Sequence, residues 1–131
     1  MPATPRAIDL THAAARAAAE RKAEEIIAID VADRLALSDV FLIVSGRSDR
    51  QVRAIVDSID EAMLKAGAKR RTREGYDEGH WVLVDYGDVV VHVQQADDRE
   101  FYALERLWAD CPAVELPDDL ERVAAEAPEQ A

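Results

Sequence analysis

The stretch Glu78–Gln95, EGHWVLVDYGDVVVHVQQ, decides the fold of this sequence. Its two runs rich in Val and Leu flank Tyr86, Gly87 and Asp88. β-Branched and aromatic residues suit a pleated strand, and glycine permits a tight reversal, so the stretch predicts a β-hairpin. Both runs are apolar at nearly every position, whereas a hairpin with one solvated face alternates apolar and polar residues. Each face of this hairpin therefore needs a cover.

Side-chain alternation assigns the hairpin residues to two faces, and the assignment is the same for a turn at Tyr86-Gly87 or at Gly87-Asp88. The turn at Gly87-Asp88 is favoured, because glycine suits its first position and Asp85 then does not lie opposite Asp88. The predicted core face carries Val82, Val84, Tyr86, Val89, Val91 and Val93. The second face carries Trp81, Leu83, Asp85, Val90, His92 and Gln94.

The second face has the composition of a contact surface. It is apolar at its centre and polar at its edges, and it includes Trp81, a residue type that concentrates in interface hot spots. Two covers are open to it: a partner protein, or the chain's own N-terminal helix or acidic tail. We favour the partner.

The composition describes one acidic domain. The chain has 131 residues, 49% hydrophobic and 33% charged, which is enough for one domain with a core. Its formal net charge of −11 argues against a protein held mainly by nucleic-acid phosphates and favours a basic partner. We expect a single domain over residues 1–115 and an acidic, partly flexible tail over residues 116–131.

The cysteine content and the apolar runs bear on the compartment. Cys111 is the single cysteine, so no intramolecular disulfide can form, as is usual in a reducing cytoplasm. Its place beside Pro112 favours a small buried or capping residue over a nucleophile. No run approaches the roughly 20 apolar residues of a membrane span, and the first residues do not have the pattern of a signal peptide. We expect a cytoplasmic protein without a membrane partner.

The rest of the chain alternates helical and strand patterns. Thr4 and Pro5 begin an alanine-rich helix whose weak apolar stripe predicts loose packing. Ser48 and Gln51 form the pattern of a capping box before a strongly amphipathic helix. Asp97 and Glu100 form the pattern of a second capping box, before a helix that ends at Cys111-Pro112. The other helices are predicted over 5–22, 49–66 and 118–125. Strands are predicted within 24–33, 39–46, 71–74 and the hairpin.

This order predicts an α/β fold of the α+β type, a two-layer structure built on a mixed five-strand sheet. The helices are too few to cover both faces, so we expect them mainly on one face, with the other face partly open. In the last long helix, one side is expected to carry Phe101, Leu104, Leu107 and Trp108.

Patterns for catalysis or metal binding are scarce. His92 shares its predicted face with Asp85, but no H-x-x-x-H, C-x-x-C or H-E-x-x-H spacing exists. For His92 we therefore favour packing beside Trp81 over a metal or acid–base role. No catalytic, cofactor-binding or metal-binding residue is predicted.

The turn at Ser45-Gly46 is similar to the Gly-Ser turn of nucleotidyltransferases. Those enzymes need two metal-binding carboxylates, one residue apart, on a following strand. Here the downstream carboxylates of Asp57, Asp60 and Glu61 fall on the polar side of a predicted helix and do not converge on a metal ion. We favour a structural turn, and keep a nucleotide-binding or nucleotidyltransferase enzyme on the same fold as the alternative function.

A local basic patch at the end of the second long helix contains Lys65, Lys69, Arg70, Arg71 and Arg73, with Glu74 beside them. Peripheral contact with rRNA or an acidic loop is one interpretation. A solvated turn that balances an acidic chain is the favoured one.

Three stretches taken together resemble the ribosomal silencing factor family, also called the RsfS or Iojap family. They are SDVFLIVSGRSDRQVRAI (38–55), EGHWVLVDYGDVVVHV (78–93) and REFYALERLW (99–108). The resemblance covers residues 5–115 and leaves the acidic tail outside. It implies a nucleotidyltransferase-like fold without the catalytic carboxylates, and hence a protein that is not an enzyme.

The resemblance also implies a partner and an effect. Members of the family bind the fourteenth protein of the large ribosomal subunit, block joining of the small subunit and repress translation when nutrients are short. They also associate with large-subunit maturation, and some are homodimers when free. The hairpin corresponds to the family's characteristic surface motif, and Gln94 stands where the family often has an aromatic residue. The predicted partner-binding residues are Trp81, Leu83, Asp85, Tyr86, Asp88, Val90 and His92.

Overall fold

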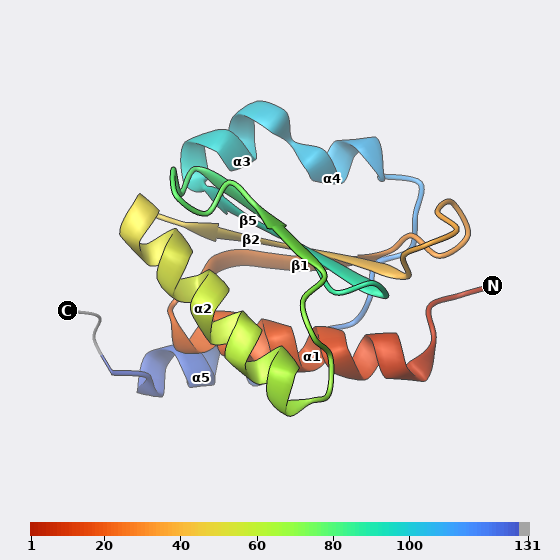
Figure 1. Ribbon diagram of the computed structural model, residues 1–131, viewed down its shortest axis with the longest axis horizontal. Helices are drawn as coiled ribbons and strands as arrows, with labels where there is room; N and C mark the ends of the chain where they lie inside the picture. The colour runs from red at the N-terminus through yellow and green to blue at the C-terminus, as the bar shows by residue number, and fades with distance from the viewer. Residues whose placement is uncertain (129–131) are drawn as a thin grey trace.

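The computed structural model describes residues 1–128 and contains a five-stranded sheet with helices on both faces (Figure 1). Across the sheet the strands are ordered β1-β2-β5-β4-β3. The strands are β1 (Glu24–Asp30), β2 (Val40–Gly46), β3 (Thr72–Glu74), β4 (Trp81–Asp85) and β5 (Val89–Gln95). The helices are α1 (Pro5–Glu20), α2 (Asp49–Lys65), α3 (Ala96–Tyr102), α4 (Leu104–Leu107) and α5 (Leu120–Glu126).

β5 is the central strand of a mixed sheet. It pairs in parallel with β2 and antiparallel with β4, and β1 and β3 are antiparallel strands at the two edges. All residues of β5 except Gln95 are buried. A strand covered on both faces has no solvated side, which explains why its sequence is apolar without alternation.

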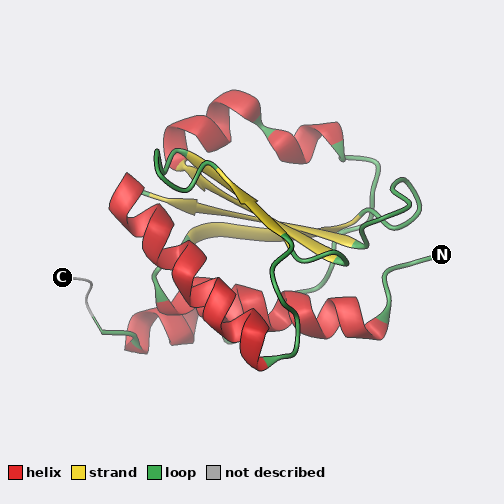
Figure 2. Ribbon diagram, viewed as in Figure 1, coloured by secondary structure: helices red, strands yellow, loops and turns green. Residues whose placement is uncertain are grey.

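The helices are divided unequally between the two faces of the sheet (Figure 2). The long helices α1 and α2, together with α5, lie on one face, and the short helices α3 and α4 cross the other. The predicted mixed five-strand sheet with helices mainly on one face is confirmed. The second face is partly covered from within the chain, but α3 and α4 form this cover, not the N-terminal helix or the acidic tail.

The hairpin has the predicted register. Val84 pairs with Val91, and the Tyr86 N–H donates to the Val89 carbonyl at 2.9 Å, which places Gly87 and Asp88 in the turn. Gly87 has φ +91°, a value that L side chains rarely adopt.

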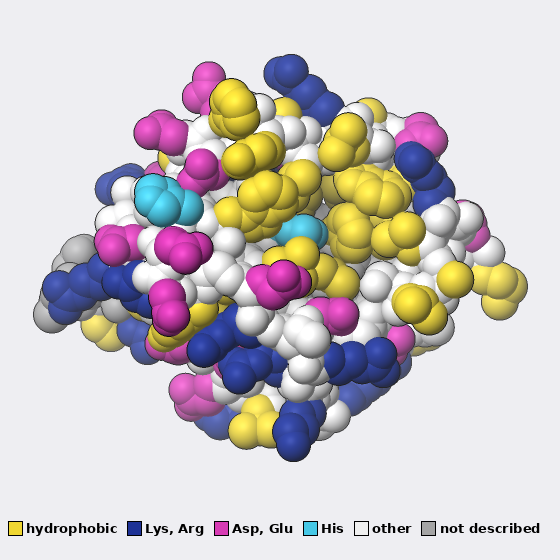
Figure 3. All heavy atoms as spheres, turned by 45° about the horizontal axis from the view of Figure 1, so that its top comes forward, with side chains coloured by type: hydrophobic (Ala, Val, Ile, Leu, Met, Phe, Trp, Pro, Cys, Tyr) yellow, Lys and Arg dark blue, Asp and Glu magenta, His cyan; other side chains and the backbone are white. Residues whose placement is uncertain are grey.

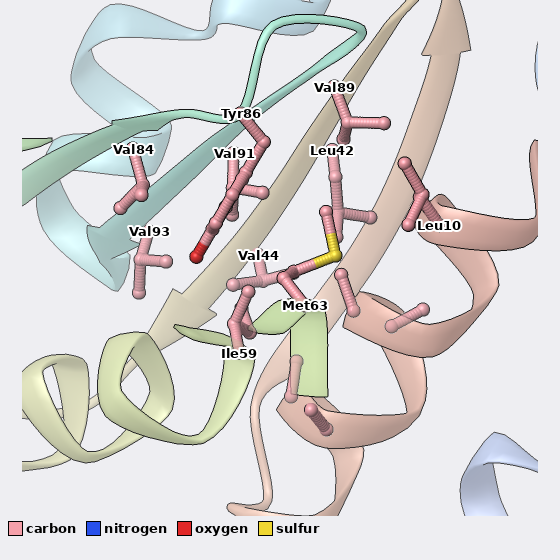
Figure 4. Packing of buried hydrophobic residues seen from close by; sticks show 14 of the residues in the cluster. Leu10, Leu42, Val44, Ile59, Met63, Val84, Tyr86, Val89, Val91 and Val93 are labelled. Carbon is pink, nitrogen blue, oxygen red and sulfur yellow. The ribbon is translucent and has the colours of Figure 1, made fainter. Parts of the chain in front are cut away.

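The face predicted as the core is buried against α1 and α2. Its valines and Tyr86 pack with side chains from β2, α1 and α2 (Figure 4). The labelled members of this cluster are Leu10, Leu42, Val44, Ile59, Met63, Val84, Tyr86, Val89, Val91 and Val93.

The alanine-rich helix α1 packs tightly, so the expectation of loose packing is wrong. Its start is as predicted, because the Thr4 side chain accepts a hydrogen bond from the Ala7 N–H at 3.1 Å. Ala14, Ala15 and Ala18 are completely buried. Small side chains let α1 approach α2 and the sheet closely. The many van der Waals contacts of this close packing stabilise the helix, although each alanine buries little apolar area.

The start of α2 is capped by a modified form of the predicted box. Ser48 Oγ accepts from the Gln51 N–H at 3.1 Å, as expected. The Gln51 side chain, however, accepts from the Arg47 N–H at 2.7 Å. Its amide also donates to the carbonyls of Arg21 and Lys22, so it joins the end of α1 to the start of α2.

The chain after α4 returns to the first face of the sheet. Ala113 forms a bridge with Ile29 of the edge strand β1, and the Val114 N–H donates to the Ala28 carbonyl at 2.9 Å. Helix α5 then packs against α1. The predicted boundary at residue 115 stays a prediction, and the last three residues of the predicted tail lie outside the described part of the chain.

Substituting Gly75 with alanine is expected to destabilise the protein by about 2–4 kcal/mol. Gly75 has φ +83°, and a Cβ there would lie 2.2 Å from the backbone oxygen of Trp81. Gly67→Ala is the matched control, because Gly67 has φ +85° but its added Cβ would meet only the flexible end of Arg6, at 3.3 Å. Urea unfolding should show the larger loss for Gly75→Ala, and equal losses would contradict the backbone clash.

Candidate partner-binding face

An uninterrupted chain of aromatic rings crosses the second face of the sheet and continues onto α3. Neighbouring ring centroids are 5.1 Å apart for Trp108 and Phe41, 5.2 Å for Phe41 and His92, and 6.1 Å for His92 and Trp81. They are 4.8 Å apart for Trp81 and Tyr102, and 4.9 Å for Tyr102 and Phe101. We call these six residues, together with Leu83, the aromatic face.

The aromatic face is an exposed apolar area with charged surroundings. Figure 3, which brings the side of α3 and α4 forward, shows hydrophobic side chains gathered around a histidine, with acidic groups beside them. Trp81 and Leu83 are half-buried, and Phe101 is 79% exposed. Large exposed aromatic side chains that adjoin one another are typical of a surface that binds a protein partner.

Sheet pairing explains how residues far apart in sequence meet here. β2 and β5 are parallel, with Phe41 beside Val90, and β4 places Leu83 beside His92. Paired residues point to the same side of a sheet, so Phe41, Leu83 and His92 share one face. The pairing between β2 and β5 could not be deduced from the hairpin sequence, and this is why Phe41 was absent from the predicted contact residues.

His92 is a neutral packing residue that orients Trp81. Its Nδ1 accepts a hydrogen bond from Trp81 Nε1 at 3.2 Å. Because Nδ1 acts as the acceptor, the proton of the neutral ring lies on Nε2. Burial lowers the pKa of His92 to about 4. The predicted packing of His92 beside Trp81 is present in the structure.

The acidic residues of the hairpin are divided between the turn and the surface. Asp85 is half-buried, and its Oδ1 accepts from the Gly87 N–H at 2.7 Å, so it stabilises the turn. Asp88 is exposed. Within residues 1–128, no group of three or more His, Cys, Asp or Glu side chains could hold a metal ion.

Tyr86 does not belong with the other predicted contact residues. It lies on the opposite face, 6% exposed, and its hydroxyl donates to Asp60 of α2. Burial raises the pKa of the Tyr86 phenol far above its ordinary value, so the hydroxyl stays a donor. A partner on the aromatic face cannot reach it through the sheet.

The segment predicted as one helix after the hairpin is broken into α3 and α4. Ala103 adopts a left-handed conformation, with φ 45° and ψ 51°. Gln95 takes the N-cap position without a side-chain capping bond, so the predicted capping box from Asp97 to Glu100 does not form. The cost of a left-handed alanine is about 1–2 kcal/mol, which tertiary contacts must offset.

The break separates the apolar residues that were expected on one side. Leu104 and Trp108 turn inward and pack on a small second cluster formed by Ile29, Val31 and Ile43. Phe101 and Leu107 face solvent. The aromatic residues 101, 102 and 108 were visible in the sequence, but their inclusion in the face depends on a backbone conformation that the sequence does not favour.

Ser45 and Gly46, predicted as a turn, form the end of β2 and have a structural role. Ser45 Oγ accepts a hydrogen bond from the buried guanidinium of Arg99 at 2.9 Å. A Cβ on Gly46 would lie 3.1 Å from the Val52 side chain, so glycine permits the close contact between β2 and α2. Ser45 Oγ thus holds the Arg99 side chain at the end of β2.

The three carboxylates considered for a nucleotidyltransferase site have other partners. Asp57 accepts from the Tyr76 hydroxyl at 2.9 Å, and Asp60 accepts from Tyr86 and pairs with Arg70. Glu61 pairs with Lys65 at 3.1 Å. All three lie on α2, beneath the core face of the sheet.

The basic patch is largely engaged by the protein itself. Arg70 pairs with Asp60 at 2.5 Å, and the Arg73 guanidinium lies 3.7 Å from the centre of the Tyr76 ring. Arg71 lies against the hairpin turn, and Lys69 is exposed.

The fold and the site define the class of this protein as a small α/β domain whose mixed sheet carries an aromatic face. A family model described as "Ribosomal silencing factor during starvation" matches residues 4–131. Ribosomal silencing factor RsfS of Bacillus subtilis is 46% identical over 103 residues, which cover 79% of this chain and 87% of that protein. The chain belongs to the RsfS family of ribosomal silencing factors.

A solved structure and a more distant relative agree with this assignment. A crystal structure of a protein from Chromobacterium violaceum is 36% identical, with a TM-score of 0.75, and covers 77% of this chain and 84% of that chain. The mouse protein named "Mitochondrial assembly of ribosomal large subunit protein 1" is 33% identical over 110 residues, which are 82% of this chain and 47% of that protein. No helix among the described residues is long and apolar enough to cross a membrane.

Lowering the pH should destabilise the wild-type protein more than the variant His92→Gln. The folded-state pKa of about 4 lies below the ordinary value of 6.5, so unfolded His92 binds its proton more tightly. The stability that this group contributes is complete above pH 6.5 and is lost as the pH falls toward 4, in total about 3 kcal/mol. Urea unfolding at pH 7 and pH 4 measures this difference, and parallel losses in both proteins would contradict it.

The variant Tyr86→Phe separates the core face from the aromatic face. Loss of the hydroxyl removes the hydrogen bond to Asp60 and should lower the free energy of unfolding by about 1 kcal/mol. Binding to large ribosomal subunits should be unchanged, because Tyr86 lies on the other side of the sheet. Weaker binding by the folded variant would show that Tyr86 takes part in the contact with the partner.

Proposed function

We propose that this protein binds the fourteenth protein of the large ribosomal subunit through the aromatic face and thereby prevents joining of the small subunit. The observation that carries the proposal is the aromatic face itself, a chain of rings with an exposed end on one face of the sheet. Membership in the silencing factor family supports the ribosome as the target. The name of the mouse relative supports the large subunit.

Trp81 and Leu83 act as the apolar anchors in this proposal. Both are half-buried on the hairpin, and Trp81 is held by His92 below it and Tyr102 beside it. Val90 and His92 are almost fully buried and support the anchors from beneath. A rigid aromatic side chain loses little conformational entropy on binding, which favours its use as an anchor.

The charge of the protein fits a basic partner. The net charge is −11, and the exposed acidic residues Glu78 and Asp88 lie before and after β4, the strand that carries the anchors. The half-buried Asp85 ends that strand. These carboxylates face Lys or Arg side chains of the partner at the rim of the contact. Rim charges raise the association rate more than they raise affinity, and their effect declines with salt.

The proposed mechanism is occupation of a surface. The bound protein covers the area where the small subunit would dock, and translation falls because subunits cannot join. No bond is made or broken, so no catalytic residue or cofactor is required. The protein acts in the cytoplasm, and a role in large-subunit maturation is compatible with the same contact.

Two further contacts are secondary in this proposal. Lys69 and Arg71 can touch rRNA at the periphery, whereas Arg70 and Arg73 have partners within the protein. A homodimer of the free protein would use exposed apolar surface that ribosome binding also needs. Size measurement of the protein alone and with large subunits shows whether one surface serves both.

Replacing Trp81 with alanine should weaken binding to large subunits by roughly 30- to 1000-fold, which corresponds to about 2–4 kcal/mol for an interface anchor. Leu64→Ala is the matched control, because Leu64 is an exposed apolar residue of α2 outside the aromatic face. Co-sedimentation of each folded variant with purified large subunits gives the affinities. Undiminished binding by Trp81→Ala would remove it as an anchor.

Subunit joining tests the effect of binding. Saturating protein should shift sucrose-gradient profiles from joined ribosomes to free subunits, and Trp81→Ala should shift them only at much higher concentration. Free joining of subunits at saturating wild-type protein would contradict the silencing mechanism.

The alternative, a nucleotide-using enzyme, is motivated by the end of β2, where Ser45 and Gly46 precede the capped start of α2. The carboxylates of Asp57, Asp60 and Glu61 weigh against it, because all three lie on α2 and have partners within the protein. Thermal unfolding with nucleotide and Mg²⁺ distinguishes the two functions, since saturable stabilisation would favour the enzyme.

A further inference from the structure

Arg99 is a buried charged residue beneath the segment that completes the aromatic face. Its side chain is almost fully covered, and it joins three elements of the fold. From α3, its Nη1 donates to Ser45 Oγ at the end of β2 at 2.9 Å. Its Nε donates to Glu105 Oε1 on α4 at 3.3 Å. A buried guanidinium is costly to bury without partners, so these bonds fix where α3 and α4 lie.

The pair between Arg99 and Glu105 depends on the break at Ala103. Residues six apart in a continuous helix are separated by about 9 Å along the axis and point in different directions. The left-handed conformation of Ala103 changes the direction of the chain, so the Glu105 carboxylate lies within hydrogen-bond distance of the Arg99 guanidinium. The same break turns Trp108 inward while leaving Tyr102 beside Trp81.

Gln94 of β5, which pairs with Ser45, does not add a second polar connection between α3 and the sheet. Gln94 is completely buried, and neither its amide nitrogen nor its amide oxygen has a hydrogen-bond partner within residues 1–128. Among the described residues, the bond from Arg99 to Ser45 is therefore the buried polar connection between α3 and the end of β2.

We propose that Arg99 is a positioning residue for partner binding: its bonds to Ser45 and Glu105 hold α3 and α4 so that Tyr102 stacks on Trp81 and Trp108 packs on Phe41. Arg99 itself does not touch the partner, because it is buried. This inference rests on the proposed function, since it names a residue that shapes the same binding face.

The variant Arg99→Met tests the inference, because it keeps much of the apolar stem and removes the guanidinium. Far-UV circular dichroism and the hydrogen exchange of β2 and β5 amides should stay as in the wild type. Exchange of the α3 and α4 amides should become at least tenfold faster, and the near-UV signal of the stacked aromatic rings should decrease. Affinity for large subunits should fall at least tenfold.

Arg106→Met is the matched control, since it removes an exposed guanidinium from the same segment. It should leave exchange, near-UV signal and affinity within twofold of the wild type. Arg99→Lys keeps the charge but cannot reach both partners with the same geometry, so its affinity should lie between those of Arg99→Met and the wild type.

If Arg99→Met does not fold, Glu105→Gln decides, because it leaves the bond between Arg99 and Ser45 in place. That variant should show faster exchange in α4 and at least threefold weaker binding. Wild-type exchange and wild-type affinity in the deciding variant would overturn the inference.

The outcomes also distinguish this inference from the proposed function. If Trp81→Ala binds large subunits as well as the wild type, the aromatic face is not the binding surface and the proposed function fails. If Trp81→Ala loses binding but Arg99→Met binds normally with a loosened α3–α4 segment, only the positioning role of Arg99 fails.

Discussion

The parallel pairing of β5 with β2 is the constraint on which the rest of this structure depends. It places β5 at the centre of the sheet, where both of its faces must be covered. The two long helices α1 and α2 bury the valine face. The other face receives only the short helices α3 and α4, whose aromatic residues join those that the sheet leaves uncovered to form the aromatic face. A surface of this kind follows from a shortage of helices on one side of a central strand.

The aromatic face combines rigid support with an exposed end. His92 and Phe41 are fixed from below by the sheet, and Trp81 is held through a hydrogen bond and ring contacts. Phe101 lies at the exposed end of the ring chain. Preorganised aromatic side chains reduce the entropy lost on association, so such a face can bind tightly without a large area.

Sequence reasoning succeeded where local pattern and tertiary structure agree. Alternation in the hairpin predicted both faces and the turn at Gly87, and the helical period predicted α2. It failed where tertiary contacts override local preference. An alanine in the left-handed region is locally unfavourable, so the helix from Asp97 was predicted to continue through Ala103. Phe41 was missed because a parallel strand partner leaves no signal in the sequence of either strand.

The sequence by itself determined the strands, the long helices and the division of the hairpin into a core face and a second face. These depend on side-chain periodicity and turn chemistry, which act over a few residues. Only the tertiary structure decided what covers the second face and which rings adjoin Trp81. Those outcomes depend on pairing between distant strands and on the buried bonds of Arg99, whose energies arise only when the chain is folded.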